Sequence, residues 1–326
     1  MSCIIIHHFL YHCITPSGLP SQLYNLINPW FFTGVNIFFL LSGWFTIRFS
    51  LKKIVMLVLL IWLYNMLNVA GCNVMGESIM PDNLLMLIFF PVAQSPYWFL
   101  QIYLALMIIA PIINLGMSAI EINLWRKIIV LLTFFVIYSC NMGLNGSFNK
   151  AGPDLLLAIY MYVLGNYIRS DKKLYDLLSP RICWVGFVLC TVLTSVATAF
   201  VAELQFLGEM YSLPLICASV LFFIGMSKLH FKSRIVNILG AASLGCYMLQ
   251  DGLFGNTVIY PKMHWQWLHG SGGSEIWLIF IALFFGYWLL ALIINPIFRF
   301  VSERIATACC RLLWRIKNYF TVRPSD

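Results

Sequence analysis

The sequence predicts an all-α, polytopic membrane helical bundle of about ten transmembrane helices, with both termini in the cytoplasm. The first observation behind this prediction is composition. Of the 326 residues, 61% are hydrophobic and 10% are charged, and the mean hydropathy is +0.87. Soluble domains carry about 25% charged residues, so a chain with so few charges is expected to lie mostly in lipid.

The second observation is where the basic residues fall when ten apolar spans are marked along the chain. Of the 20 Lys and Arg residues, 18 lie in alternate connectors and the C-terminal tail, and only Lys150 and Lys262 lie in the other connectors. Because cytoplasmic loops of membrane proteins are enriched in Lys and Arg, this alternation places both termini in the cytoplasm. It also places Lys172 and Arg234 there, and Lys150 and Lys262 on the opposite side.

Charge and cysteine content exclude two other classes of protein. The formal net charge of +8 could suggest a nucleic-acid partner. The basic residues lie in short connectors and the tail, however, rather than on one face of a domain, so no nucleic acid is expected. The ten cysteines are scattered through apolar runs without a Cys-x-x-Cys pair, which predicts neither a disulfide framework nor a zinc site.

The spans follow one another from the N-terminus, and charged or turn-forming connectors separate them. The predicted spans are residues 1–15, 30–47, 54–70, 97–115, 128–142, 155–168, 182–201, 213–226, 235–254 and 276–298. Residues 84–90 are also apolar, but they are too short to cross the ~30 Å hydrocarbon core. We interpret them as a re-entrant or interfacial segment.

The two ends of the chain depart from this regular pattern. The first span ends at Pro16 and covers only about 22 Å of a ~30 Å core, so we expect a first helix truncated at its N-terminus and further in-frame residues upstream. A signal peptide is the competing explanation, but the segment has no basic n-region and no small-residue cleavage site. We expect residues 1–302 to form one transmembrane domain, and residues 303–326 a basic amphipathic cytoplasmic tail on anionic lipid.

The first span contains three histidines, His7, His8 and His12. Ionisable side chains in a spanning helix are costly and usually face a protein interior or a watery cavity, which makes these residues candidates for function. His8 and His12 lie one helical turn apart and share a face, whereas His7 points about 100° away, nearer Tyr11. The alternative is that the imidazoles only hydrogen-bond across helices.

Three further stretches, residues 34–44, 97–100 and 243–251, place polar or aromatic side chains among small and apolar ones. An Asn deep in an apolar run needs a partner, which a substrate hydroxyl or another helix could supply. The aromatic residues could instead form a membrane-interface belt, and the small residues could serve helix packing alone. The candidate substrate-binding residues of these stretches are Asn36, Ser42, Tyr97, Trp98, Gln250 and Asp251.

In order and spacing, these stretches resemble the acyltransferase-3 family of bacterial integral membrane acyltransferases, and most closely its exopolysaccharide and O-antigen O-acetyltransferase branch. His7-His8-Phe9 is similar to the first helix of that branch, residues 34–44 to its second, residues 95–100 (SPYWFL) to its fourth and residues 243–250 to a late helix. The resemblance spans essentially the whole chain.

Two positions depart from the pattern of that family. Members of the family carry an Arg eleven positions before the His of the first helix. If His8 is that His, the position of the Arg falls ahead of Met1. We therefore expect the upstream extension to contain this Arg. In many relatives a His stands where this chain has Gln250, so a second histidine role does not carry over.

The resemblance implies transfer of an acyl group, most often acetyl, from cytoplasmic acyl-CoA to a hydroxyl of a surface polysaccharide or its lipid-linked precursor, at the bacterial inner membrane. His8, or His7 if the register differs by one, would act as general base, because a neutral imidazole can accept the hydroxyl proton. Basic residues after the second span could hold the phosphates of the coenzyme, although topology alone would also explain them: Arg48, Lys52 and Lys53. No tightly bound cofactor and no metal is expected.

A transporter or flippase for a lipid-linked glycan is the main alternative. Such a protein should show paired, Gly- or Pro-broken helices in two corresponding halves, and the sequence shows no such symmetry. A glycan polymerase usually carries a large periplasmic loop, which is missing from the predicted topology. A di-iron desaturase needs several histidine clusters, whereas the other three histidines are predicted to lie on opposite faces of the membrane.

Overall fold

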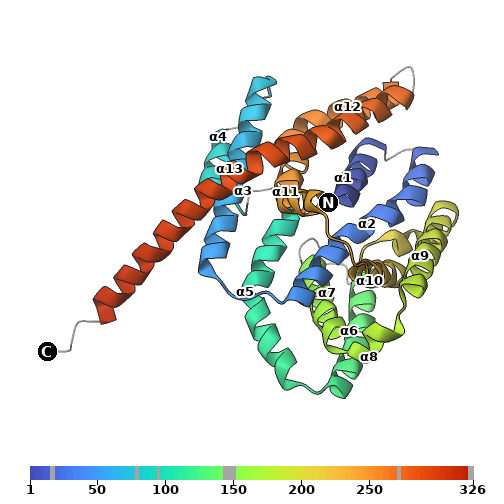
Figure 1. The fold of residues 1–326 in the computed structure, drawn as a ribbon. Coiled ribbons are helices and arrows are strands. Elements are labelled where there is room, and N and C mark those ends of the chain that lie inside the picture. The colour runs from blue at the N-terminus through green and yellow to red at the C-terminus, as the bar shows by residue number, and fades with distance from the viewer. Residues whose placement is uncertain (15–18, 78–80, 94–95, 142–151, 270–272, 322–326) are drawn as a thin grey trace. The chain divides into compact units, whose positions relative to one another are not determined.

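A computed structural model of the chain describes residues 1–14, 19–77, 81–93, 96–141, 152–269 and 273–321. Every regular element in these ranges is a helix (Figure 1). The α-helices and short π and 3-10 segments (η) are, in order, α1 (Ser2–Phe9), η1 (Leu10–Ile14), α2 (Leu19–Phe45), α3 (Leu51–Val74), α4 (Pro81–Phe89), α5 (Trp98–Ala119), α6 (Ile122–Asn141), α7 (Gly152–Ser170), α8 (Lys172–Leu177), α9 (Pro180–Phe200), η2 (Ala202–Gly208), α10 (Leu213–Ser227), α11 (Arg234–Gln250), η3 (Gly255–Ile259), α12 (Tyr260–His269) and α13 (Gly273–Thr321).

Six helical segments of the described residues are long and apolar enough to cross a membrane: Gln22–Phe45, Leu51–Val74, Trp98–Ala119, Pro180–Phe200, Ala202–Ser227 and Glu275–Ile316. They coincide with six of the predicted spans. The other four predicted spans also fall on helices, namely α1 with η1, α6, α7 and α11, which are shorter or more polar. The all-helical membrane fold is thus confirmed, and the count of about ten stays a prediction.

Helix α2 begins at Leu19, eleven residues before the predicted start of the second span, so the prediction of a loop there was wrong. Pro29 lies inside this helix and removes the N–H that would bond to the carbonyl of Asn25. Thr198 on α9 lies beside that carbonyl, with its hydroxyl oxygen 3.2 Å away, and the amide of Asn25 donates to the carbonyl of Thr198 at 3.1 Å. A neighbouring helix thus makes polar contacts at the place where Pro29 interrupts the hydrogen bonds of α2. The local sequence does not reveal these contacts.

The described residues form two compact units. Unit 1 comprises residues 1–48 and 102–232, and unit 2 comprises residues 49–101 and 233–326. In unit 1, α2 is the central helix and packs against α1, α7, α9 and α10. In unit 2, α13 packs against α3 and α11.

Helices α2 and α7 approach so closely that their backbones touch. A Cβ atom built on Gly43 of α2 would overlap the carbonyl oxygen of Tyr162 on α7, and one built on Gly165 of α7 would overlap the carbonyl oxygen of Leu40 on α2. Small residues at a crossing point permit such close packing in membrane proteins, where dispersion contacts rather than water exclusion hold helices together.

The C-terminal end of α2 is fixed by a ring of three hydrogen bonds. Thr46 has a φ of 55°, in the left-handed region that non-glycine residues seldom adopt. The next backbone N–H, of Ile47, donates to the Tyr162 hydroxyl at 2.9 Å, and the Asn114 amide donates to the Ile47 carbonyl at 2.9 Å. The Tyr162 hydroxyl closes the ring by donating to Asn114 Oδ1 at 2.8 Å. This ring joins α2, α5 and α7 where the chain leaves the helix.

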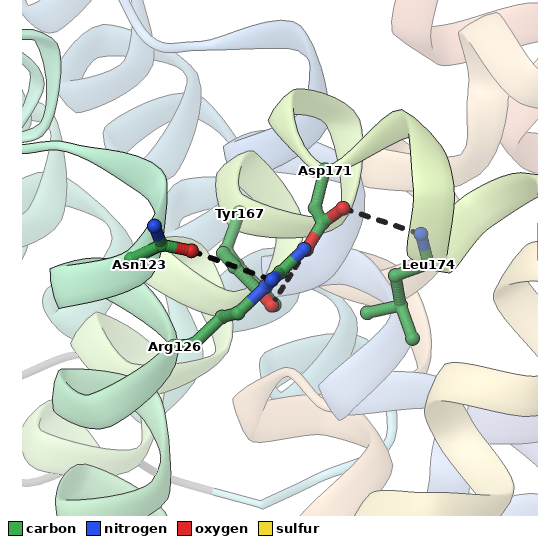
Figure 2. A network of polar contacts seen from close by, with 5 residues as sticks. All are labelled: Asn123, Arg126, Tyr167, Asp171 and Leu174. Carbon is green, nitrogen blue, oxygen red and sulfur yellow. Dashed lines mark hydrogen bonds and ion pairs between the residues drawn. The ribbon is translucent and has the colours of Figure 1, made fainter.

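An ion pair connects α6 to the start of α8 in unit 1 (Figure 2). The Asp171 side chain is only 3% exposed, and its Oδ2 lies 3.0 Å from Arg126 Nη2. The Tyr167 hydroxyl donates to the same oxygen at 3.0 Å, and the Leu174 N–H donates to Oδ1 at 3.2 Å. Burial alone would raise the pKa of Asp171, but these donors outweigh burial and hold its pKa below the ordinary 3.8.

We expect Asp171→Asn to lower the thermal unfolding temperature of the purified protein by a few degrees at pH 7. A carboxylate with a depressed pKa stabilises the fold at every pH above its unfolded value, and this contribution is lost as pH falls below about 3.8 towards the folded pKa. The difference between variant and wild type should therefore shrink as pH is lowered through that range. The matched control is Asp176→Asn, on the exposed side of the same short helix α8. It should change the unfolding temperature little. An equal effect of both substitutions would contradict the proposed role of the network.

Unit 2 contains the longest helix. At 49 residues, α13 is about 74 Å long, much longer than a ~30 Å hydrocarbon core. It runs without a break across residue 303, where a separate tail was expected, and reaches Thr321. Figure 1 shows its C-terminal half extending past the other helices of unit 2. By contrast, α4 has nine residues and is too short to cross, as predicted for residues 84–90.

Candidate functional site

The histidine pair lies on α1, which packs against α2 in unit 1. His7 and His8 are buried, with 8% and 9% of their surfaces exposed, and their ring centroids lie 5.4 Å apart. Two adjacent ionisable side chains are thus held in an apolar environment, which is costly and marks a candidate site.

His7 is fixed by two residues of α2. Its Nδ1 lies 2.5 Å from Asn28 Oδ1, and its ring stacks on Phe32 with centroids 4.3 Å apart and planes 11° from parallel. An amide oxygen only accepts, so the pair places the imidazole proton on Nδ1 and leaves the lone pair of Nε2 available. The contact thus holds the His7 ring in one orientation and one tautomer beside His8.

His8 lies beside His12. The rings of His8 and His12 meet edge to face at a centroid distance of 5.8 Å, and His7 stacks 6.0 Å from Tyr11. Both pairings were predicted from helical spacing. Residues Leu10–Ile14 form a π-helical turn immediately after the histidine pair, and such turns occur frequently at functional sites.

Asn36 and Ser42 lie further along α2, in the same unit. Asn36 is fully buried, and its Nδ2 donates to the carbonyl of Met210 at 2.8 Å. Within the described residues, its Oδ1 has no hydrogen-bond partner, so a hydroxyl donor could still bind there. The Ser42 hydroxyl donates to the Phe38 carbonyl one turn earlier, at 2.9 Å, which leaves it only as an acceptor.

In unit 2, Tyr97 belongs to a buried polar junction around Asn68 of α3. The Tyr97 hydroxyl donates to the Met248 carbonyl at 2.7 Å, and Asn68 Nδ2 donates to the same hydroxyl at 3.1 Å. Asn68 Oδ1 accepts from the N–H of Phe254 at 3.2 Å. Asn68 therefore bonds both the end of α11 and the chain beyond it, where the helical hydrogen-bond ladder is interrupted.

Gln250 and Asp251 end α11 beside this junction. Gln250 is fully buried, and its Oε1 accepts from the Tyr260 hydroxyl at 3.1 Å. Asp251 caps the C-terminus of α11 and is 6% exposed. The ring of Tyr247, one turn before Asp251, contacts the Tyr97 ring in a tilted arrangement, with the centroids 5.8 Å apart. The structure thus brings Tyr97, Gln250 and Asp251 together around the end of one helix.

The Trp98 ring contacts the Phe99 ring at a centroid distance of 6.2 Å. Of the basic candidates, Arg48 is exposed beyond the end of α2 in unit 1, and the other two lie in the first turn of α3 in unit 2. Lys52 is paired with Glu303 of α13 at 2.8 Å, and Lys53 is exposed.

Sequence reasoning missed Asn28 and Asn68, which hold His7 and Tyr97. Each is an Asn within an apolar segment, the same signal that identified Asn36. Asn28 was assigned to the uncharged loop before the second predicted span, and Asn68 was passed over within a strongly apolar span. An amide in such a segment is expected to find a partner because an unpaired buried polar group is costly.

The fold and these residues define a membrane-embedded helical protein with a buried histidine pair held by a neighbouring helix. The chain belongs to the acyltransferase-3 family, whose model, described as an acyltransferase domain, matches residues 1–298. It is therefore a membrane acyltransferase, as the resemblance in the first helix and the later stretches predicted. No curated protein and no solved structure matches the chain.

Proposed function

We propose that this protein transfers an acyl group, most often acetyl, from acyl-CoA to a hydroxyl of a bacterial surface polysaccharide or its lipid-linked precursor, in the inner membrane. The observation that carries the proposal is the buried histidine pair, His7 and His8, with His7 oriented by Asn28 at 2.5 Å. The resemblance to the O-acetyltransferase branch supplies the choice of acetyl and of a glycan acceptor.

The chemistry assigned to the pair is general base and then general acid catalysis. A neutral imidazole accepts the proton of the acceptor hydroxyl as its oxygen attacks the thioester carbonyl carbon. The tetrahedral intermediate then collapses with loss of the CoA thiolate, which receives the proton from the imidazolium. We assign the base to His8, which aligns with the histidine of the family, and a positioning role to His7. Asn36, which lies on α2 in the same unit as the histidines, is the proposed acceptor-binding residue, because its buried Oδ1 has no hydrogen-bond partner within the described residues.

Purified protein in lipid nanodiscs, supplied with acetyl-CoA and a glycan acceptor, tests the function directly. We expect free CoA thiol to appear only when the acceptor is present, and mass spectrometry to find the acceptor acylated. A transporter or flippase would move a labelled lipid-linked glycan across the bilayer without releasing CoA. That result would overturn the proposal.

The topology that belongs to this function is ten spans with both termini in the cytoplasm. We expect an impermeant maleimide to label Cys at position 262 in intact cells and not at positions 172 or 234, in a background without the native cysteines. Lys150, which is predicted to face outward with Lys262, lies outside the described residues. We expect a Cys at position 150 to be labelled as well. Labelling at position 172 from outside would contradict the ten-span arrangement.

A further inference from the structure

An open groove runs between α11 and α13 in unit 2. Its first part has a volume of about 410 Å³ and a largely apolar lining that includes Ala241 and Ala242 of α11 and Leu292 of α13, with Arg299, Phe300 and Glu303 at one edge. Ala241 is exposed. The two alanines leave room for a narrow apolar group between the helices.

The groove continues along α13 as a second recess of about 570 Å³. Phe300 and Glu303 belong to both parts, and Arg304 and Arg311 line the second one, with Thr307 and Ala308 between them. These residues recur every three or four positions and so share one face of the helix. Arg304 and Arg311 are two turns apart, about 10 Å along the axis.

The charges in this groove are unequally satisfied. The carboxylate of Glu303, which lines the groove, is bound to Lys52 at 2.8 Å. The Arg304 guanidinium lies over the Phe300 ring, 5.0 Å from its centroid. Arg304 and Arg311 are exposed, and neither takes part in the ion pairs that the described residues show. The groove therefore has a positive end and an apolar end.

We propose that this groove binds the acyl-CoA donor, with the phosphates on Arg304 and Arg311 and the pantetheine arm directed along Ala241 and Ala242. This inference rests on the proposed function and assigns its donor site. Guanidinium groups suit phosphate because they offer paired N–H donors and are always charged. Lys52, first considered for the phosphates, is bound to Glu303 and instead fixes the start of α3 to the wall of the groove.

The test measures binding of CoA and of adenosine 3′,5′-bisphosphate to the full chain in nanodiscs of neutral phosphatidylcholine. We expect R304Q/R311Q to weaken both ligands about tenfold or more, because hydrogen bonds to charged groups are among the strongest polar contacts. Ala241→Phe should weaken the binding of CoA, because it fills the apolar part of the groove, and should leave the affinity for the bisphosphate unchanged. The matched control K172Q/K173Q removes two exposed charges from α8 in unit 1 and should bind both ligands as wild type does.

The outcomes separate this proposal from the proposed function. If wild type binds CoA and R304Q/R311Q binds it equally well, the groove is not the donor site, although acyl transfer from CoA can still be correct. If the double variant loses binding to vesicles containing phosphatidylglycerol but keeps its affinity for CoA, the arginines bind phospholipid head groups and the proposal is wrong. If wild type neither binds CoA nor releases its thiol in the transfer assay, the proposed function fails as well.

Discussion

Replacing His8 by alanine is expected to lower the rate of acyl transfer by about 10²–10⁴-fold, the usual cost of losing a general base, while membrane insertion is retained. The structural cost should be small, because an average interhelical hydrogen bond in a membrane contributes only about 0.6 kcal/mol. CoA release in nanodiscs, together with thermal unfolding of the same preparation, separates a chemical effect from a folding effect. His12→Ala, at the neighbouring ring, should be milder.

The two adjacent histidines make this prediction sharper. If His7 only positions the pair, Asn28→Ala and His7→Ala should both lower kcat partially and shift its pH profile. If His7 is the base, His7→Ala should abolish transfer and His8→Ala should leave it nearly intact, which would show that the assigned register is wrong by one residue. Near-normal transfer in both alanine variants would remove the catalytic role from this site altogether.

The second large effect is expected at the crossing of α2 and α7. Gly43→Ala and Gly165→Ala each place a methyl group against a backbone carbonyl of the other helix. A carbonyl of a packed helix cannot rotate away as a side chain can, so the two helices must separate. Overpacking of this kind costs about 1–3 kcal/mol and occasionally more, and we expect these variants at or above the upper end. Thermal unfolding and size-exclusion profiles of purified protein would measure the loss.

Gly116→Ala is the matched control in the same unit. Gly116 also lies within a helix, α5, but a Cβ atom there meets no other atom within 4 Å. Removing a helical glycine at an open position is expected to stabilise the protein by up to about 1 kcal/mol. Wild-type stability in Gly43→Ala would show that α2 and α7 do not approach as closely as the structure places them.

The sequence by itself determined the class of fold and the approximate positions of the apolar spans. A transmembrane helix needs about 20 apolar residues in a row, so each span is encoded locally and can be read from composition. The histidine pair was found for the same reason, because an ionisable side chain in an apolar run stands out without any knowledge of its neighbours. The pairing of His7 with Tyr11 and of His8 with His12 follows from helical spacing alone.

The tertiary structure alone decided which side chains complete the site. Asn28 lies 21 residues from His7, and Thr198, which contacts Asn25 near Pro29, lies 173 residues further along the chain than Asn25. Glu303 is 251 residues from Lys52. Hydropathy specifies that a segment enters the membrane, but it does not specify which face meets which neighbour. That choice depends on the close approach of backbones and on the pairing of buried polar groups, and both arise only when the helices are packed.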